Sequence, residues 1–460
     1  MVDLAREFDA YLRAKLDEYI QEVSQLCAQP SISARQEGVL ECAELVAQTL
    51  QKHGFRAQKY ETPGNPVIVG RASGRSARTL LFYNHYDVQP PEPLDLWTTP
   101  PFQPTIRDGL LYARGAQDDK GEFVARLAAV DAVRSAYSGE LPCNVIFVVE
   151  GEEEIGSPHI ATFALQNKEA LICQGAIWEE GGIDKDGSPY NVLGGRGALS
   201  VELTVQTMKR DQHSGGAHMF PSAAWRLVRV LESLKGADER IRIEGFYEAV
   251  RPPTKLDLEL TDALPTREEQ FRELLGIREF VLGRTGKELN RAVFEPTCNI
   301  QGIQTGYQDK GAKTIVPARA SAKLDFRLVP DQDPNDILQK LRQHLDTQGF
   351  TDVGIAQLGG AIWPVKWSAE NPLVRLAARA GEEVYDLPTR IYPLIGGSSP
   401  VYAFTNSLGA IPVILAGVGY WDNRQHAPDE HVRLVDFLNA ARHIARILDG
   451  FADLSERNGQ

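Results

Sequence analysis

Apolar strands that alternate with amphipathic helices dominate the sequence and restrict the folds open to it. Runs rich in Val, Ile, Leu and Phe predict strands at 67–70, 79–83, 144–150, 175–177 and 411–416, and helical periodicity predicts helices at 4–26, 39–52, 122–134, 371–385 and 434–448. The strands are continuously apolar, which is typical of a parallel sheet that is buried on both faces. The sequence therefore predicts an α/β fold with a mostly parallel sheet sandwiched by helices.

A different pattern begins near residue 194. Residues 199–207 and 320–328 alternate apolar and polar side chains, and further elements are predicted at 223–234, 336–347 and 353–358. This arrangement predicts an α+β sheet with helices on one face, and the charged stretch 235–293 is interpreted as an elaboration of it. Because 460 residues exceed a single core and the α/β pattern returns afterwards, we expect a split larger domain, 1–195 and 365–460, with an inserted domain at 196–364.

Composition excludes several classes of protein. Asp and Glu number 62 against 49 Lys and Arg, a net charge of -13, which argues against binding to nucleic acid or to anionic lipid. No apolar run approaches the ~18 residues of a membrane span, and the N-terminal stretch is a charged helix rather than a secretory signal. The five cysteines are scattered without a CxxC pair, so we expect a protein of a reducing compartment, the cytoplasm.

Residues that can bind metal follow the predicted strands or precede a helix. They are His85, Asp87, Asp118, Asp119, Glu153, Glu154, Glu179, Glu180 and His426. Taken singly, most have ordinary explanations: His85 and Asp87 as strand-end polar residues, Asp118 and Asp119 as the N-cap of a helix. Taken together they lie after strands of one predicted sheet, where α/β proteins bind ligands.

The set has the composition of a dinuclear metal site. Imidazole and carboxylate without thiolate suit Zn, Mn or Co, and two metals need a bridging carboxylate and one uncoordinated carboxylate as base. The sequence contains no HExxH, GxSxG, GxxxxGK[ST] or strand-linked GxGxxG motif, so the common competing mechanisms lack their motifs.

The ordered motifs carry a family resemblance. His-x-Asp at 85–87, Gly-x-x-Asp-Asp-Lys-Gly at 115–121, Glu-Gly-x-Glu-Glu-x-Gly-Ser at 150–157, a lone acid and a late histidine resemble the dinuclear zinc amidohydrolases, from residue 31 to 447. That family includes carnosinase, the cytosolic nonspecific dipeptidase, aminoacylase, acetylornithine deacetylase, succinyl-diaminopimelate desuccinylase and the glutamate-releasing carboxypeptidase. The resemblance is closest to the dipeptidase branch, and it implies that 1–195 and 365–460 form the catalytic domain.

The resemblance also implies residue roles. The metal ligands would be His85, Asp118, Glu154, Glu179 and His426, with Asp118 as the bridge between two divalent ions, Zn first and Mn or Co as alternatives. Glu153 would be the general base, and Asp87 would orient His85. Glu180 remains an alternative to Glu179. The family pattern further implies a cis peptide between Asp118 and Asp119.

The inserted domain resembles the family's lid, which also forms a dimer interface. His213, in Asp-Gln-His-Ser-Gly, would reach the partner's active site and stabilise the oxyanion; taken alone, it is a loop histidine. Arg327, Thr314, Gly397 and Ser398 would bind the substrate carboxylate. The implied protein is a homodimer without nucleic-acid or membrane partners.

The implied reaction is hydrolysis of the amide bond of a dipeptide or small peptide by a metal-bridged water, with Glu153 as general base. Three alternatives stay open at this point. They are an N-acyl amino-acid deacylase of the deacetylase or desuccinylase type with the same site, a non-catalytic metal- or ligand-binding relative, and a structural protein that uses the alternating strand as a dimer edge.

Overall fold

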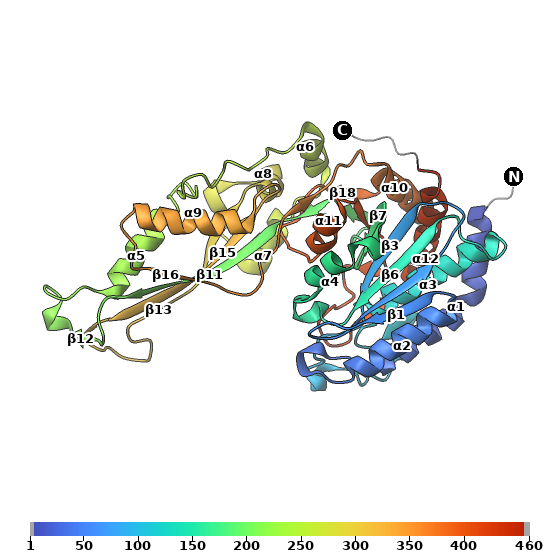
Figure 1. The fold of residues 1–460 in the computed structure, drawn as a ribbon, viewed down its shortest axis with the longest axis horizontal. Helices are drawn as coiled ribbons and strands as arrows, with labels where there is room; N and C mark the ends of the chain where they lie inside the picture. Colours follow the sequence, from blue (N-terminus) through green and yellow to red (C-terminus); the bar gives the residue numbers. More distant parts are fainter. Residues whose placement is uncertain (1–3, 455–460) are drawn as a thin grey trace. The chain divides into compact units, whose positions relative to one another are not determined.

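The computed structural model describes residues 4–454, which divide into two compact units (Figure 1). Of these residues, unit 1 comprises 4–193, 367–392 and 403–454, and unit 2 comprises 194–366 and 393–402. The boundaries expected from the sequence, after residue 195 and before residue 365, lie within two residues of the divisions at 193 and 367. The segment Pro393–Tyr402, expected in the larger domain, groups instead with unit 2. Within residues 4–454, no helix combines the length and apolar character that crossing a membrane requires.

Unit 1 is built on a six-stranded sheet in the order β1-β2-β6-β3-β7-β19. Its strands are β1 (Arg56–Tyr60), β2 (Val67–Ala72), β6 (Asn144–Glu150), β3 (Thr79–His85), β7 (Gly175–Trp178) and β19 (Val413–Leu415). The β6–β3, β3–β7 and β7–β19 pairs are parallel, whereas β1–β2 and β2–β6 are antiparallel. Every residue of β3 is buried, as a central strand covered on both faces requires.

Helices cover both faces of this sheet, which confirms the α/β architecture. One core holds α1 (Leu4–Ala28), α2 (Val39–Lys52), α3 (Lys120–Ala136), α10 (Pro372–Tyr385) and α12 (Leu434–Phe451), packed against every second strand residue. On the other face Tyr83 stacks on Trp178, and both contact Phe404 of α11 (Tyr402–Leu408). The helix α4 (Ile160–Gln166) also packs there, because Phe163 contacts Tyr60 of β1.

Smaller sheets complete unit 1. They are β21 (His431–Arg433), β5 (Leu110–Tyr112) and β4 (Thr105–Arg107) in one sheet, β18 (Arg390–Tyr392) with β9 (Tyr190–Val192), and β20 (Gly419–Tyr420) with β8 (Gly182–Ile183). The first of these pairs the chain around residue 432 with the chain around residue 111. This pairing joins two loops that carry candidate site residues.

Unit 2 has an antiparallel sheet in the order β13-β15-β11-β16. Its long strands β11 (Gly197–Gln206) and β15 (Arg319–Leu328) pair over their full length, flanked by β13 (Thr297–Thr305) and β16 (Gly354–Gln357). Burial alternates along β11, and its buried side chains share a core with α5 (Ala223–Leu234) and α9 (Pro334–Thr347). The remaining elements are α6 (Lys255–Ala263), α7 (Glu268–Leu275), α8 (Lys287–Arg291), and the short pairs β12 (Gln212–His213) with β14 (Ile315–Val316) and β10 (Gly194–Gly195) with β17 (Val365–Lys366).

In the six-stranded and four-stranded sheets, only β1 and β13 have no counterpart among the predicted strands. Each is the outer strand of its sheet, and both are polar or exposed along most of their length. Edge strands with exposed, polar side chains lack the apolar pattern on which strand prediction depends.

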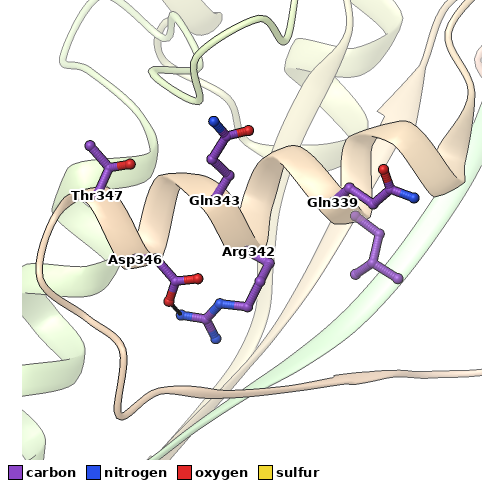
Figure 2. Close-up of a pocket in the computed structure, with 6 residues that line it drawn as sticks. Gln339, Arg342, Gln343, Asp346 and Thr347 are labelled. Carbon is purple, nitrogen blue, oxygen red and sulfur yellow. Dashed lines mark hydrogen bonds and ion pairs between the residues drawn. The ribbon is translucent and has the colours of Figure 1, made fainter.

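A shallow hollow lies on the outer surface of α9 (Figure 2). It is lined by Leu338, Gln339, Arg342, Gln343, Asp346 and Thr347. Arg342 and Asp346 form an ion pair along the helix, with 2.6 Å between Nη2 and Oδ1. None of the residues predicted for the active site lines this hollow.

The N-terminal helices of unit 1 are joined by a buried histidine. Nδ1 of His53, at the end of α2, contacts Asp131 of α3, and Nε2 lies 2.8 Å from Oε2 of Glu22 in α1. Burial alone would lower the pKa of His53, but the hydrogen bonds to Asp131 and Glu22 outweigh it and raise the pKa to about 9. The protonated imidazole therefore links three helices.

This linkage predicts a pH-dependent contribution to stability. A histidine whose pKa is raised on folding contributes fully below its unfolded pKa of about 6.5. The contribution is lost as the pH rises through about 9. The difference in unfolding free energy between wild type and H53Q should shrink by roughly 3 kcal/mol between about pH 6 and about pH 10. Chemical denaturation of both proteins across this range measures it, and a constant difference would contradict the charged pairing.

Candidate metal centre

Three neighbouring parallel strands end in polar residues at one edge of the main sheet. His85 is the last residue of β3, Glu153 and Glu154 follow β6 in a single helical turn, and Glu179 follows β7 directly. β6, β3 and β7 are adjacent and parallel, so their carboxyl ends meet at the same edge. The sequence showed the same local pattern, in which an apolar strand is followed by acidic residues.

Asp118 lies between two histidines. Its Oδ1 is 2.9 Å from Nε2 of His85, and its Oδ2 is 2.9 Å from Nε2 of His426. The two oxygens of one carboxylate thus face two imidazoles that are 341 positions apart in the sequence. A carboxylate arranged in this way can bridge two cations.

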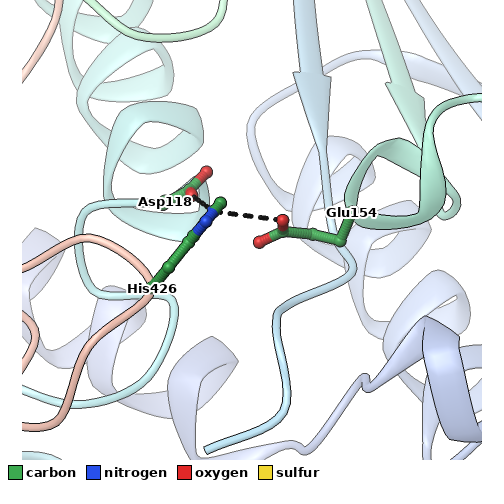
Figure 3. Close-up of side chains that lie close together, drawn as sticks. All are labelled: Asp118, Glu154 and His426. Atoms are coloured by element: carbon green, nitrogen blue, oxygen red, sulfur yellow. Dashed lines mark hydrogen bonds and ion pairs between the residues drawn. The ribbon is translucent and has the colours of Figure 1, made fainter. Parts of the chain in front are cut away.

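Glu154 joins the same group from the opposite side. Its Oε2 lies 3.1 Å from Nε2 of His426, and one ligand atom each from Asp118, Glu154 and His426 lie within 4.8 Å of one another (Figure 3). Gln89 holds the Glu154 carboxylate in place through its backbone N–H at 3.1 Å and its side-chain amide at 2.8 Å.

Asp87 anchors the glutamate turn as well as His85. Its carboxylate accepts the backbone N–H of Glu153 at 3.2 Å and that of Glu154 at 3.0 Å. Its Oδ1 is 3.4 Å from Nδ1 of His85, whose closer contact is with the Asp87 carbonyl oxygen at 3.0 Å. The sequence predicted only a contact with His85, because the link to the glutamates depends on how β3 and β6 pair.

The peptide between Asp118 and Asp119 is cis, as the resemblance implied. Oδ2 of Asp119 accepts the side-chain amide of Asn84 at 2.6 Å and the backbone N–H of His85 at 3.0 Å. Asp119 therefore ties the segment that carries Asp118 to the end of β3.

Glu179 and Glu180 have different surroundings. Glu179 is buried, and its Oε1 accepts the indole N–H of Trp178 at 2.9 Å, whereas its Oε2 has no hydrogen-bond partner within residues 4–454. Glu180 is an exposed residue whose Oε1 lies 3.3 Å from Nε2 of Gln425. A buried carboxylate oxygen without a donor needs a cation or a proton, which favours Glu179 as the ligand.

The electrostatics of the site reflect crowding of buried carboxylates. Burial alone would raise the pKa of Asp118, but hydrogen bonds from His426 and His85 hold it well below its usual range. Hydrogen bonds to Asp118 and Glu154 raise the pKa of His426 to about 10. Burial, reinforced by neighbouring carboxylates, raises the pKa of Glu153 to about 7.

These side chains offer the donor atoms that divalent cations bind. All the donor atoms are imidazole nitrogens or carboxylate oxygens, which suits Zn, Mn or Co. Each oxygen of Asp118 already faces one histidine, and the unpartnered Oε2 of Glu179 supplies a further anionic atom. One cation would be held by His85, Asp118 and Glu179, and the other by His426, Asp118 and Glu154.

Two of the predicted substrate-binding groups meet in unit 2. Nη1 of Arg327 donates to Oγ of Ser398 at 2.9 Å, and Nε donates to Oδ2 of Asp325 at 3.0 Å. The carbonyl oxygen of Gly397 accepts the backbone N–H of Arg196 at 2.9 Å. Arg327, Gly397 and Ser398 thus lie at the end of the sheet where β11 begins and β15 ends.

His213 and Thr314 lie at the other end of the same sheet. The exposed His213 is in β12, which pairs with β14, and the backbone N–H of Ser214 donates to the carbonyl of Thr314 at 3.0 Å. Figure 1 shows β12 beyond one end of β11 and β15. Arg319 and Arg327, at opposite ends of β15, are roughly 26 Å apart at the usual rise of a strand. The structure therefore separates Thr314 from Arg327, although the sequence grouped them.

Sequence reasoning missed several residues of the site. The fully buried Arg126 of α3 donates to the carbonyls of Tyr83 and Trp178, at the ends of β3 and β7, and to Oδ1 of Asn84. Gln425 donates to Oδ2 of Asp118 at 2.8 Å. Gln425 could have been found from its place beside His426, but an arginine inside a helix offers no such signal.

Comparison with known proteins decides the family. Residues 81–450 match the family described as "Peptidase family M20/M25/M40". The chain belongs to this peptidase family. It is a hydrolase, and the expected resemblance to the dipeptidase branch is confirmed by its relatives.

The relatives include dipeptidases that match nearly the whole chain. The Cys-Gly metallodipeptidase dug1 of Schizosaccharomyces pombe is 26% identical and covers 96% of this chain and 97% of its own length. The Beta-Ala-His dipeptidase of Homo sapiens is 26% identical over 96% of this chain and 92% of its own. Among solved structures, the M20 family metallo-carboxypeptidase Sso-CP2 from Sulfolobus solfataricus has a TM-score of 0.85 at 35% identity, covering 95% of this chain and 100% of its own.

The surroundings of Glu179 and Glu180 generate a prediction about metal content. E179Q should lose bound metal, because the buried oxygen without a donor is the one that a cation would neutralise. E180Q should keep the wild-type content, because Glu180 is exposed and already bonded to Gln425. Elemental analysis of both purified variants beside wild type checks this, and metal loss in E180Q alone would reverse the assignment.

Proposed function

We propose that this protein hydrolyses the amide bond of dipeptides or other small peptides at a dinuclear metal centre. The observation that carries the proposal is Asp118, whose two oxygens face His85 and His426 with Glu154 alongside. The names of the relatives from fission yeast and human, both dipeptidases, support the substrate class.

Two divalent cations, with zinc the first choice and manganese or cobalt as alternatives, would supply a polarised scissile carbonyl and a water of lowered pKa. The residues that would hold them are His85, Asp118, Glu154, Glu179 and His426. Asp87 would hold the turn that carries Glu153 and Glu154 in a fixed position relative to His85, through the contacts described above.

Glu153 is the proposed general base. Its backbone N–H is fixed on Asp87, and burial raises the pKa of its carboxyl, which favours a group that takes and returns a proton. Glu153 would accept a proton from the attacking water and then deliver it to the leaving amine.

Arg327 is the proposed anchor for the substrate carboxylate. Asp325 holds its Nε and Ser398 contacts its Nη1, so the guanidinium is oriented before a ligand arrives. A guanidinium binds a carboxylate through parallel N–H bonds. Gly397 and the hydroxyl of Ser398 would add polar contacts at the same end of the sheet.

His213 and Thr314 would act on the active site of a second copy of the chain. A dipeptide spans about 7 Å, far less than the roughly 26 Å of β15 that separates the Arg327 end of unit 2 from the His213 end. If Arg327 and His213 both contact one substrate, they come from different chains. This argument favours a homodimer in which the partner's histidine stabilises the oxyanion.

Two related activities are the alternatives to a dipeptidase. An N-acyl amino-acid deacylase would use the same ligands and the same carboxylate anchor. A carboxypeptidase is favoured by the 35% identity to Sso-CP2, which is described as a metallo-carboxypeptidase. Both rivals accept a blocked N-terminus, whereas a dipeptidase needs a free amine.

A substrate panel tests the proposal. Metal-loaded protein should release amino acids from Ala-Ala and similar dipeptides with a higher kcat/KM than from N-acetyl-Ala or N-acetyl-Ala-Ala. Preference for N-acetyl-Ala would indicate a deacylase, and preference for N-acetyl-Ala-Ala or longer peptides would indicate a carboxypeptidase. Removal of metal with a chelator should abolish turnover, and Zn or Mn should restore it.

Substitution of the proposed base separates chemistry from metal binding. E153Q should keep its metal but lose turnover by on the order of 10³-fold, because the amide cannot accept the proton. The matched control is E152Q, since the neighbouring Glu152 is buried and paired with His159 rather than with the metal site. A kcat of E153Q near that of E152Q would remove Glu153 from the mechanism.

Mixing two inactive variants tests the exchange of His213 between chains. E153Q and H213A should each be nearly inactive. After co-refolding in equal amounts, half of the dimers are mixed, and each has one site with an intact Glu153 and an intact partner histidine. About a quarter of wild-type activity should therefore return. No recovery, with mixed dimers demonstrated by affinity tags, would show that His213 does not act between chains.

A further inference from the structure

Glu430 is a fully buried carboxylate that no role described above uses. It has 0% exposure. Its Oε1 accepts the backbone N–H of Gln117 at 3.0 Å and that of Asp118 at 3.1 Å, and its Oε2 accepts the N–H of Gly115 at 3.0 Å. Nη1 of Arg114 lies 2.7 Å from the same Oε2. One side chain thus gathers four donors from the segment 114–118.

The position of Glu430 connects two candidate ligands. It lies four residues after His426, and it binds the N–H of Asp118 across 312 residues of sequence. The backbone repeats the connection, because the N–H of Ala113 donates to the Glu430 carbonyl at 3.1 Å and His431 pairs with Tyr112 between β21 and β5. The loop that carries His426 and the loop that carries Asp118 are therefore locked together at Glu430.

Folding stability alone does not explain this buried ion pair. Arg114 is also buried, donates to the carbonyl of Pro90 and lies over the ring of Trp97. Replacing a buried ion pair of this kind with apolar side chains of similar volume is often neutral or stabilising. What apolar side chains cannot do is hold three backbone N–H groups in one orientation.

That orientation decides where the Asp118 carboxylate points. Asp118 needs one oxygen on each histidine, and its own hydrogen bonds come from His85, His426 and Gln425. The two histidines are themselves proposed metal ligands, so their hydrogen bonds to the carboxylate would be replaced once the cations are present. The bond to Glu430 comes instead from the backbone N–H of Asp118, which is not a metal-binding group.

We propose that Glu430 is the positioning residue of the metal centre: by holding the N–H groups of Gly115, Gln117 and Asp118, it sets Asp118 to bridge both cations. The proposal rests on the proposed dinuclear site. It assigns Glu430 no contact with metal or substrate. Loss of Glu430 should weaken the binding of both cations together, because Asp118 would be a ligand of both.

Asp429 provides a matched control on the same loop. It is also buried and accepts two hydrogen bonds, from the N–H of Thr98 at 2.8 Å and from its hydroxyl at 2.7 Å. It lies one residue closer to His426, but it binds none of the segment 114–118. A general loosening of the His426 loop should therefore follow from D429N as well as from E430Q.

The experiment measures zinc affinity of the full chain by competition with a chromophoric chelator, for wild type, E430Q and D429N. In E430Q the amide NH2 would face backbone N–H donors, so the segment must shift. We expect both zinc equivalents to bind 10- to 100-fold more weakly in E430Q, the range typical of residues that support metal ligands. D429N should stay within about twofold of wild type. Thermal melting of the metal-free proteins reports their stability separately.

The outcomes separate this proposal from the proposed function. Equal zinc affinity in E430Q and wild type would overturn it, as would equal losses in E430Q and D429N. A loss of only one equivalent would also contradict it. If wild type itself binds no zinc, manganese or cobalt, the dinuclear centre fails first and the role of Glu430 with it. Should E430Q not fold, E430D, which keeps the charge but is one methylene shorter, must show the same paired loss.

Discussion

Repulsion between buried carboxylates is the constraint around which unit 1 is organised. Asp118, Glu153, Glu154 and Glu179 all lie at the carboxyl edge of one sheet, where burial and like charge raise the pKa values of Glu153 and Glu179. The fold holds these segments in place through other bonds. The carboxylates of Asp87 and Glu430 accept the backbone N–H groups of Glu153 and Asp118, and the guanidinium of Arg126 donates to carbonyls at the strand ends. Oε2 of Glu179 has no such partner within the described residues. The proposed pair of divalent cations would complete the compensation and would turn the same repulsion into binding energy.

A second constraint is the length of the sheet in unit 2. β11 and β15 pair over ten residues each without a register shift, so the sheet is a rigid spacer between the Arg327 end and the His213 end. A substrate much shorter than this spacer cannot contact both ends of one copy. If Arg327 and His213 both contact one substrate, as proposed above, this length requires that they come from different chains.

The sequence was most informative where structure is local. The buried strands β3 and β6, the helix α2 and the alternation along β11 follow from periodicity, because each reports its own burial. The ligand candidates follow from their position after strands. The edge strands β1 and β13 do not, since their exposed residues carry no apolar pattern. The grouping of Pro393–Tyr402 with unit 2 depends on contacts such as Gly397 with Arg196, which no local pattern reports.

The same distinction separates ligands from the residues that aim them. A metal ligand must be one of few residue types, and strand ends bring such residues into short motifs. A residue that aims a ligand needs only a donor or acceptor at the right point in space, and the fold can draw it from anywhere. Asp87 is only two residues from His85, yet its bonds to Glu153 and Glu154, 66 and 67 residues away, arise only when β3 and β6 pair. Glu430 and Arg126 are further cases: one is a surface-like acid in a loop, the other a helical arginine, and both are fully buried. The local pattern of a helix or loop does not require a buried charged side chain. Where such a side chain occurs next to a site, it is therefore a structural sign of a residue that positions the ligands.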